Sequence, residues 1–83
     1  MTLQEKIDKL PLSIDHHRRT YNLRFGGKSD YIYIEYFNTD GLGNYRSLLE
    51  EYNEDLNQSL SQRLEDVVDK ALTIIENKEW EKL

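Results

Sequence analysis

Two runs of alternating apolar and polar residues, joined by a glycine-containing segment, most restrict how this chain can fold. Tyr21, Leu23 and Phe25 are separated by single polar residues, which is the period of two expected of a β-strand with one buried face. The second run is rich in isoleucine and tyrosine, which strands favour. The pattern predicts an antiparallel β-hairpin with strands at 20–25 and 31–37.

The second predicted strand carries bulky side chains on both faces. One face holds Ile32, Ile34 and Tyr36, and the other holds Tyr31, Tyr33, Glu35 and Phe37. Such a strand is either covered on both sides by helices, or it presents its tyrosine face as a contact surface.

A short helix is expected before the hairpin, over residues 3–9. Thr2 and Glu5 have the spacing of a capping box, in which each side chain satisfies a free backbone N–H of the other residue. Pro11 ends the helix, because the residue before a proline is driven out of the α region. The connector that follows leaves room for a brief strand at Leu12–Ile14.

The second half of the chain has helical spacing. Tyr45, Leu48, Leu49, Tyr52 and Leu56 fall on one face of a helix over 45–56. After a break, Ser59 can cap a second helix with a wide apolar stripe. The stripe consists of Leu60, Leu64, Val67, Val68, Ala71, Leu72, Ile74 and Ile75. The two stripes do not line up, which favours two helices over one continuous helix. An alternative makes Asp40-Gly41 a hairpin turn leading to a third strand over 42–48.

Composition restricts the class of protein. The 83 residues predict a single domain, and the absence of cysteine excludes disulfides and thiolate metal sites. No apolar run is long enough to span a bilayer, and the N-terminus lacks the order of a secretory signal. We therefore expect a cytoplasmic protein without membrane association. The composition is of a kind met in small proteins of phages and mobile elements.

Charge is divided unequally along the chain, and this division leads to the main functional hypothesis. Residues 1–46 contain seven Lys/Arg and six Asp/Glu, whereas residues 47–83 contain four and ten, giving the net charge of −5. Carboxylates on the outer faces of two helices could dock on a basic surface of a larger protein. The predicted partner-binding residues are Glu50, Glu51, Glu54, Glu65, Asp66, Asp69 and Glu76.

Nucleic-acid binding is the alternative, because cations and aromatic rings together bind single strands. The candidate residues are Arg18, Arg19, Tyr21, Arg24, Lys28, Tyr31 and Tyr33. Against this, Tyr21 and Arg24 point to opposite faces of one strand, and the acidic balance disfavours general binding to nucleic acid.

Catalytic and metal-binding motifs are not apparent. His16 and His17 are adjacent and therefore diverge, while a transition-metal site needs three or four converging ligands. No serine lies in a nucleophile elbow, and no carboxylate pair has neighbours that would separate its two pKa values. We expect no enzymatic activity, no cofactor and no bound metal.

The sequence thus predicts an α+β fold with a short N-terminal helix, an antiparallel hairpin and two C-terminal amphipathic helices. It predicts a non-catalytic, acidic interaction module, such as an accessory or inhibitor protein, that docks on a larger protein with a basic surface. A structural homodimer is the further alternative, because so wide an apolar stripe suits self-association.

Overall fold

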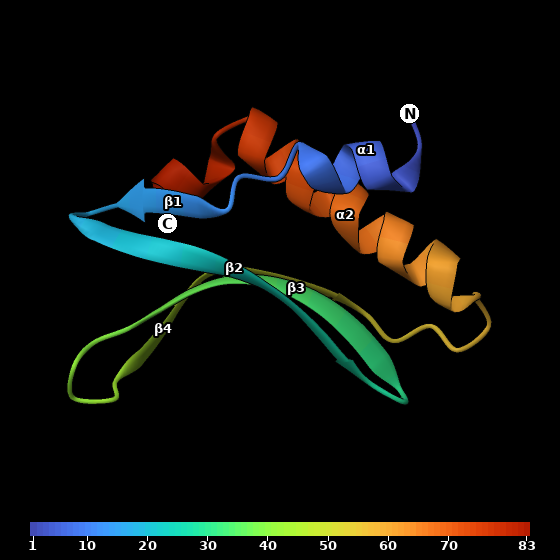
Figure 1. Ribbon diagram of the computed structural model, residues 1–83, viewed down its shortest axis with the longest axis horizontal. Helices are drawn as coiled ribbons and strands as arrows, with labels where there is room; N and C mark the ends of the chain where they lie inside the picture. The colour runs from blue at the N-terminus through green and yellow to red at the C-terminus, as the bar shows by residue number, and fades with distance from the viewer.

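A computed structural model describes residues 1–83 and shows an α+β fold built on one antiparallel sheet (Figure 1). The elements in order are α1 (Leu3–Asp8), β1 (Ser13–His16), β2 (Arg19–Lys28), β3 (Tyr31–Thr39), β4 (Tyr45–Asn53), α2 (Leu60–Glu76) and the 3₁₀ helix η1 (Glu79–Lys82). The four strands lie side by side in chain order, β1-β2-β3-β4. Each strand therefore pairs with its neighbour in sequence, and β1 and β4 form the two edges.

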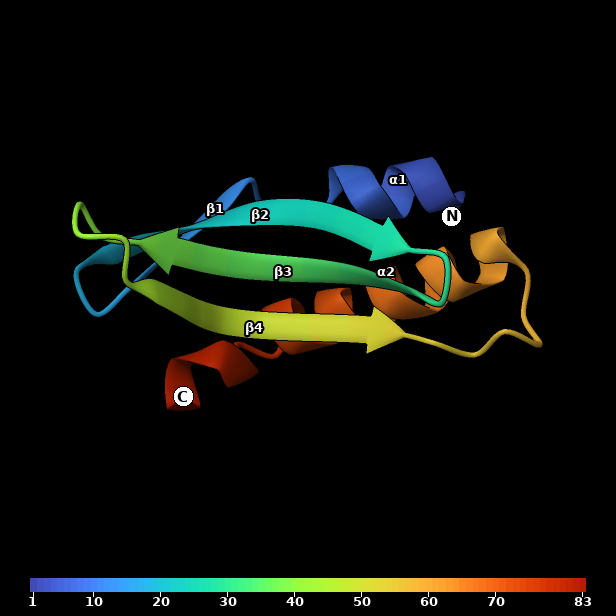
Figure 2. The ribbon, with the colours of Figure 1, turned by 90° about the horizontal axis from the view of Figure 1, so that it is seen from below.

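The helices all lie on one side of the sheet. Figure 1 shows α1, α2 and η1 above the sheet, and the strands arch so that the other side is concave. Figure 2, seen from that other side, shows β2, β3 and β4 in front, with no element covering them. The sheet thus has a helix-covered face and an open face.

The prediction of a helix over 45–56 is wrong, because these residues form the edge strand β4. β4 pairs with β3 from Thr39↔Tyr45 to Ile32↔Asn53, with a β-bulge where Tyr36 and Phe37 face Leu49 and Ser47. The bulge inserts Leu48, so that Leu48 and Leu49 are both buried on the helix-covered face. An inserted residue shifts the phase of the period of two, and the apolar spacing then imitates that of a helix.

The chain therefore has one C-terminal α-helix rather than two, and four strands rather than a hairpin. The alternative third strand over 42–48 placed the turn correctly, although β4 begins at Tyr45 and runs to Asn53. Asp40 holds the turn by accepting hydrogen bonds from the backbone N–H groups of Leu42 and Asn44. The Asn44 side-chain amide also donates a hydrogen bond to Asp40. This bond first, and the two backbone bonds after it, lower the pKa of the Asp40 carboxyl.

The predicted hairpin is present, but its strands are longer than expected. β2 continues through Gly26 and Gly27 to Lys28, which pairs with Tyr31. The Tyr33 ring lies over Gly26, and a Cβ atom there would be 2.4 Å from its hydroxyl oxygen. Gly26 thus gives the ring its place, and the turn is reduced to Ser29-Asp30. The brief strand expected at Leu12–Ile14 corresponds to β1, one to two residues later.

Both helix starts agree with the sequence. Thr2 and Glu5 form the full capping box of α1, and the Ser59 hydroxyl accepts a hydrogen bond from the Gln62 backbone N–H at the start of α2. Leu60, placed in the predicted stripe, is nevertheless exposed. At the other end Lys78 adopts a left-handed conformation, φ 52°. This turns the chain back, so that Trp80 packs against the core.

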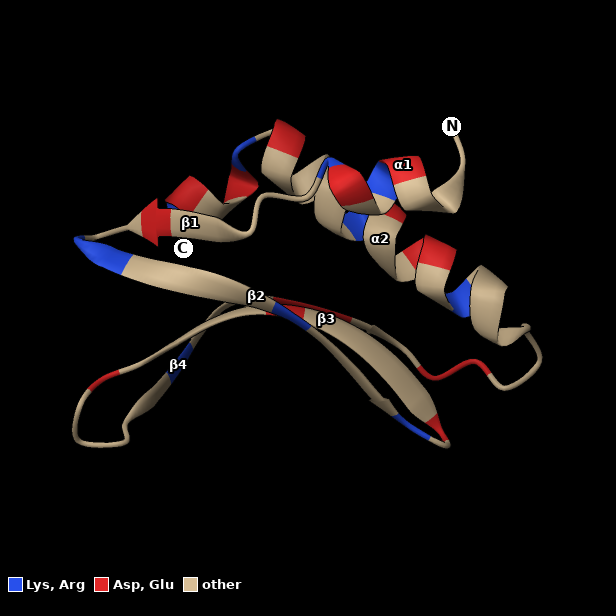
Figure 3. Cartoon of the chain, in the orientation of Figure 1, with Lys and Arg blue, Asp and Glu red and all other residues tan.

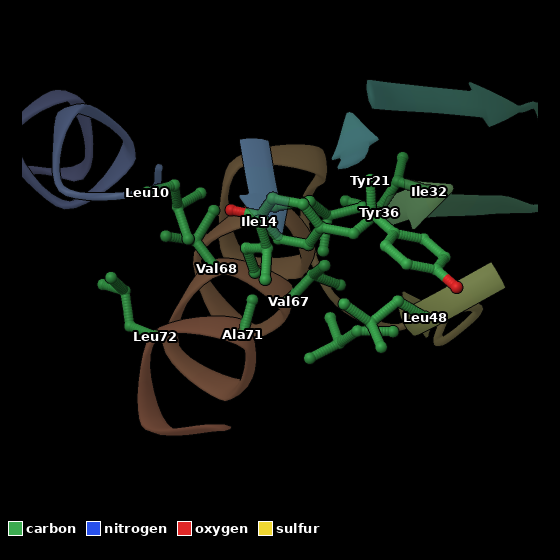
Figure 4. Close-up of a cluster of buried hydrophobic side chains, with 12 residues drawn as sticks. Leu10, Ile14, Tyr21, Ile32, Tyr36, Leu48, Val67, Val68, Ala71 and Leu72 are labelled. Carbon is green, nitrogen blue, oxygen red and sulfur yellow. The ribbon is translucent and has the colours of Figure 1, made fainter. Parts of the chain in front are cut away.

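The core fills the space between the sheet and α2 (Figure 4). Twelve apolar residues form one buried cluster. They are Leu10, Ile14, Tyr21, Ile32, Ile34, Tyr36, Leu48, Leu49, Val67, Val68, Ala71 and Leu72. Tyr36 is fully buried, and its hydroxyl donates a hydrogen bond of 2.7 Å to the Pro11 carbonyl oxygen. This bond ties the centre of the sheet to the connector between α1 and β1.

None of the helices combines the length and the apolar character that crossing a membrane requires.

Candidate functional site

The open face of the sheet is polar and aromatic, because strand alternation sends every second side chain to it. Cross-strand neighbours share a face, so Arg24, Glu35 and Glu50 lie in one row and Gly26, Tyr33 and Tyr52 in the next. The open face is formed by Asn22, Arg24, Lys28, Tyr31, Tyr33, Glu35, Phe37, Thr39, Tyr45, Ser47, Glu50 and Tyr52. It corresponds to the tyrosine face that the sequence offered as a contact surface.

Glu35 is a buried carboxylate at the centre of this open face, with only 3% of its surface exposed. Arg24 covers it: Nε donates a hydrogen bond of 2.8 Å to Oε1, and Nη2 lies 2.7 Å from the same oxygen. The Tyr45 hydroxyl donates to Oε2. The pKa of the Tyr45 hydroxyl is raised, mainly because the group is partly buried. The hydrogen bond to Glu35 and the negative charge of Glu35 raise it further. Both carboxylate oxygens are thus satisfied within the chain.

Aromatic rings surround the Arg24 guanidinium. Its central carbon lies 4.4 Å from the centre of the Phe37 ring and 5.7 Å from those of Tyr33 and Tyr45. These distances are in the range of cation–π contacts. The open face therefore already binds one arginine side chain, its own, with one carboxylate and a set of rings.

A hollow of about 220 Å³ lies beside this cluster, near the edge of the sheet. It is lined by Tyr31, Glu50, Tyr52 and Glu54. Glu50 and Tyr52 alternate along β4, and Glu54 follows its last residue. Neither Glu50 nor Glu54 takes part in an ion pair. The hollow has the tyrosine and glutamate content of the Arg24 site without a cation of its own.

The predicted acidic residues do not form two outward helical faces. Glu50, Glu51 and Glu54 belong to β4 and the residue after it, rather than to a helix. Glu65 and Asp69 of α2 bind Lys6 of α1, with Nζ–oxygen distances of 2.9 and 3.0 Å. These two predicted partner-binding acids are therefore engaged within the chain, where they hold α1 against α2.

Asp66 also has a partner within the chain, while Glu76 has none. The Asp66 carboxylate lies 3.2 Å from Lys70 Nζ and accepts a hydrogen bond of 2.9 Å from the Asn53 side-chain amide. The bond to Asn53 links α2 to the end of β4. Glu76 is exposed at the end of α2. Figure 3 shows the resulting distribution, with acidic segments along α2 and on the segment after β4.

Glu51 points to the helix-covered side of β4. It lines a groove of about 330 Å³ together with Asp66, Asp69, Lys70, Thr73 and Ile74 of α2. Burial raises the pKa of the Glu51 carboxyl, Lys70 lowers it and Asp66 raises it further, with a net upward shift. Glu51 makes no ion pair in the chain, so its partly desolvated charge has no cation within ion-pair distance.

The residues proposed for nucleic-acid binding do not gather on one surface. Tyr21 is buried under the helices, with 6% of its surface exposed. Arg18 and Arg19 lie at the β1–β2 turn and Lys28 at the opposite end of β2, as the blue segments in Figure 3 show. Arg24 is bound to Glu35. Arg24, Lys28, Tyr31 and Tyr33 share the open face, whereas Arg18, Arg19 and Tyr21 do not gather with them.

The two histidines follow β1 in the sequence, and in space they lie close to the C-terminal segment of the chain. The His16 ring packs edge-on against Trp80, with 5.6 Å between ring centres, and His17 starts the two-residue turn to β2. No group of three or more His, Cys, Asp or Glu side chains is placed to hold a metal ion.

Sequence reasoning overlooked the Arg24–Glu35–Tyr45 cluster and the Tyr31–Tyr52 hollow. A signal for the hollow exists, because Glu50, Tyr52 and Glu54 alternate with a period of two. The helical spacing of the leucines obscured that signal.

Comparisons with protein-family models, with curated proteins and with solved structures gave no match for this chain.

Proposed function

We propose that this chain is a non-catalytic interaction module that docks on a basic surface of a larger protein. The observation that carries the proposal is the hollow formed by Tyr31, Glu50, Tyr52 and Glu54 on the open face. Two carboxylates and two tyrosines suit a lysine or arginine side chain, which gains charge-assisted hydrogen bonds and cation–π contact together.

The neighbouring cluster supports this choice of ligand. Arg24 is held by Glu35 and by three aromatic rings on the same face, those of Tyr33, Phe37 and Tyr45. The hollow repeats that chemistry for a side chain from outside. The net charge of −5 favours encounter with a basic partner and makes the association sensitive to salt.

Compared with the helical acids that the sequence suggested, the acids of the hollow are better placed for a partner. Glu65 and Asp69 are bound to Lys6, and reversing their charge would disturb the docking of α1. Glu50 and Glu54 have no ion-pair partner and lie on an uncovered face.

The test is binding of a fluorescent oligolysine peptide, followed by anisotropy, to the intact chain and to matched variants. Glu50→Lys with Glu54→Lys should abolish binding. The control pair Glu76→Lys with Glu81→Lys changes the net charge equally at sites outside the hollow, and should retain most of it. Tyr52→Ala leaves the charge unchanged and should weaken binding several-fold, by roughly 1 kcal/mol of lost cation–π contact. Equal losses in the two lysine pairs, with no effect of Tyr52→Ala, would contradict the proposal.

A further inference from the structure

The outer edge of β4 is an unpaired strand edge. β4 is the last strand of the sheet and pairs with β3 alone. None of the backbone hydrogen bonds outside the regular elements involves residues 45–53. The outward N–H and C=O groups of this nine-residue strand therefore have no backbone partner within the chain, and a strand edge of this kind can pair with another strand.

The bulge makes the facing pattern of β4 symmetrical about its centre. Tyr45 and Ser47 face the open side before the bulge, and Glu50 and Tyr52 do so after it. The other four residues of this stretch face the helix-covered side; they are Arg46, Leu48, Leu49 and Glu51. Read from either end, the strand presents the same order of faces.

The chemistry of β4 follows the same symmetry. Moving outward from the centre, Leu48 matches Leu49, and Ser47 matches Glu50. Arg46 then matches Glu51, and Tyr45 matches Tyr52. The exposed tyrosines form a like pair suited to packing and Arg46 and Glu51 are opposite charges, while the two leucines are buried in the core of their own chain.

We propose that two copies of this chain pair β4 against β4, antiparallel, about a two-fold axis between Leu48 and Leu49. The four strands of each copy then form one continuous sheet. An isologous contact requires a self-complementary patch, and β4 is self-complementary in faces, packing and charge.

The register is specified by charge and by facing. In this register Arg46 of each copy lies opposite Glu51 of the other, so the two-fold axis forms two such pairs. Neither residue has an ion-pair partner within its own chain, and a close guanidinium offsets the partial desolvation of Glu51. A slip of two residues places Leu49 opposite Glu50 or Arg46, and a slip of one places open-face residues opposite covered ones.

Pairing also changes the hollow on the open face. Tyr45 of the second copy lies opposite Tyr52 and adds a third tyrosine to the border of the hollow. Two such hollows then lie on one extended face, which permits bivalent docking on a basic surface. This last consequence rests on the proposed function, whereas the pairing of β4 does not.

The first test is the mass of the intact chain by sedimentation equilibrium over the micromolar range. We expect a dimer of the 9.9 kDa chain. R46E and E51K each place like charges opposite one another twice, and should raise the dimer dissociation constant roughly tenfold or more. The double variant R46E/E51K restores opposite charges and should restore the dimer. Glu76→Lys, with the same charge change as Glu51→Lys, should leave it intact.

The second test fixes the register. The chain contains no cysteine, so Ser47→Cys and Glu50→Cys chains can be mixed and oxidised. Directly opposite residues have Cβ atoms about 5 Å apart, close enough for a disulfide after slight adjustment. We expect the mixed disulfide to exceed both self-disulfides, whose residues lie about 10 Å apart along the strands.

A wild-type mass of 9.9 kDa across the whole range would overturn the pairing. So would single charge reversals without effect on the dimer, or self-disulfides that form as readily as the mixed one. Circular dichroism of each variant separates loss of the dimer from loss of the fold. Oligolysine binding is measured independently, so the failure of one proposal is distinguishable from the failure of the other.

Discussion

Arg24 and Glu35 lie directly opposite each other on β2 and β3, and the arginine covers a carboxylate that is otherwise buried. Replacing Arg24 by methionine leaves that carboxylate without its cation, so the variant should be less stable in urea than the wild type. Replacing Glu35 by leucine in the same chain removes the unpaired buried charge and should recover most of the lost stability. Equal instability of the single and double variants would show that the ion pair is not what keeps Glu35 buried.

Ile34 is fully buried at the centre of β3. Ile34→Ala should lower the free energy of unfolding by about 2–4 kcal/mol, because it removes methylenes from a small core and leaves a cavity. Ile34→Val, the conservative control, should cost only about 1 kcal/mol. A urea titration that finds the alanine variant within experimental error of the wild type would contradict the assigned face of β3.

Substitutions in the β1–β2 turn should raise the stability of the protein. His17 and Arg18 both have positive φ, 50° and 64°, as a two-residue turn between right-twisted strands requires. Most residues with a Cβ atom are strained there, whereas Asn and Gly adopt positive φ readily, so Asn-Gly is the preferred pair. His17→Asn with Arg18→Gly should therefore raise the free energy of unfolding by about 1 kcal/mol. A lower melting temperature for this variant would count against the turn.

Tyr36 should contribute to the stability of the protein at alkaline pH. Burial raises the pKa of its hydroxyl above the ordinary 10.0, so the folded chain keeps a proton that the unfolded chain releases. This contribution is present below about pH 10 and is lost as the pH rises further. Tyr36→Phe should cost about 1 kcal/mol at neutral pH, through loss of the bond to Pro11. Its stability should then fall less steeply above pH 10, measured by urea titration at each pH.

Local rules predicted the elements in which one periodicity acts alone. The capping residues Thr2 and Ser59 mark the starts of α1 and α2, and the alternation of Tyr21, Leu23 and Phe25 marks β2. The α+β class followed from these elements.

The edge strand β4 could not be predicted in the same way, because its bulge is specified by pairing with β3. Leu48 and Leu49 are adjacent in sequence and both buried, a combination that fits a helix better than a regular strand. The open-face site depends on this strand, since Tyr45, Glu50 and Tyr52 reach it only when β4 pairs with β3. The residues that β4 contributes therefore could not be grouped with those of β3 while the segment was assigned to a helix.

The most direct test of the account is an NMR titration of the isotopically labelled chain with an oligolysine peptide. Amide shift changes should concentrate at Tyr31, Glu50, Tyr52 and Glu54, and saturate with the affinity found by anisotropy. Glu76 and Glu81, which are exposed acids elsewhere, should move little. Shifts spread evenly over all exposed acids, or centred on α2, would contradict a docking site on the open face of the sheet.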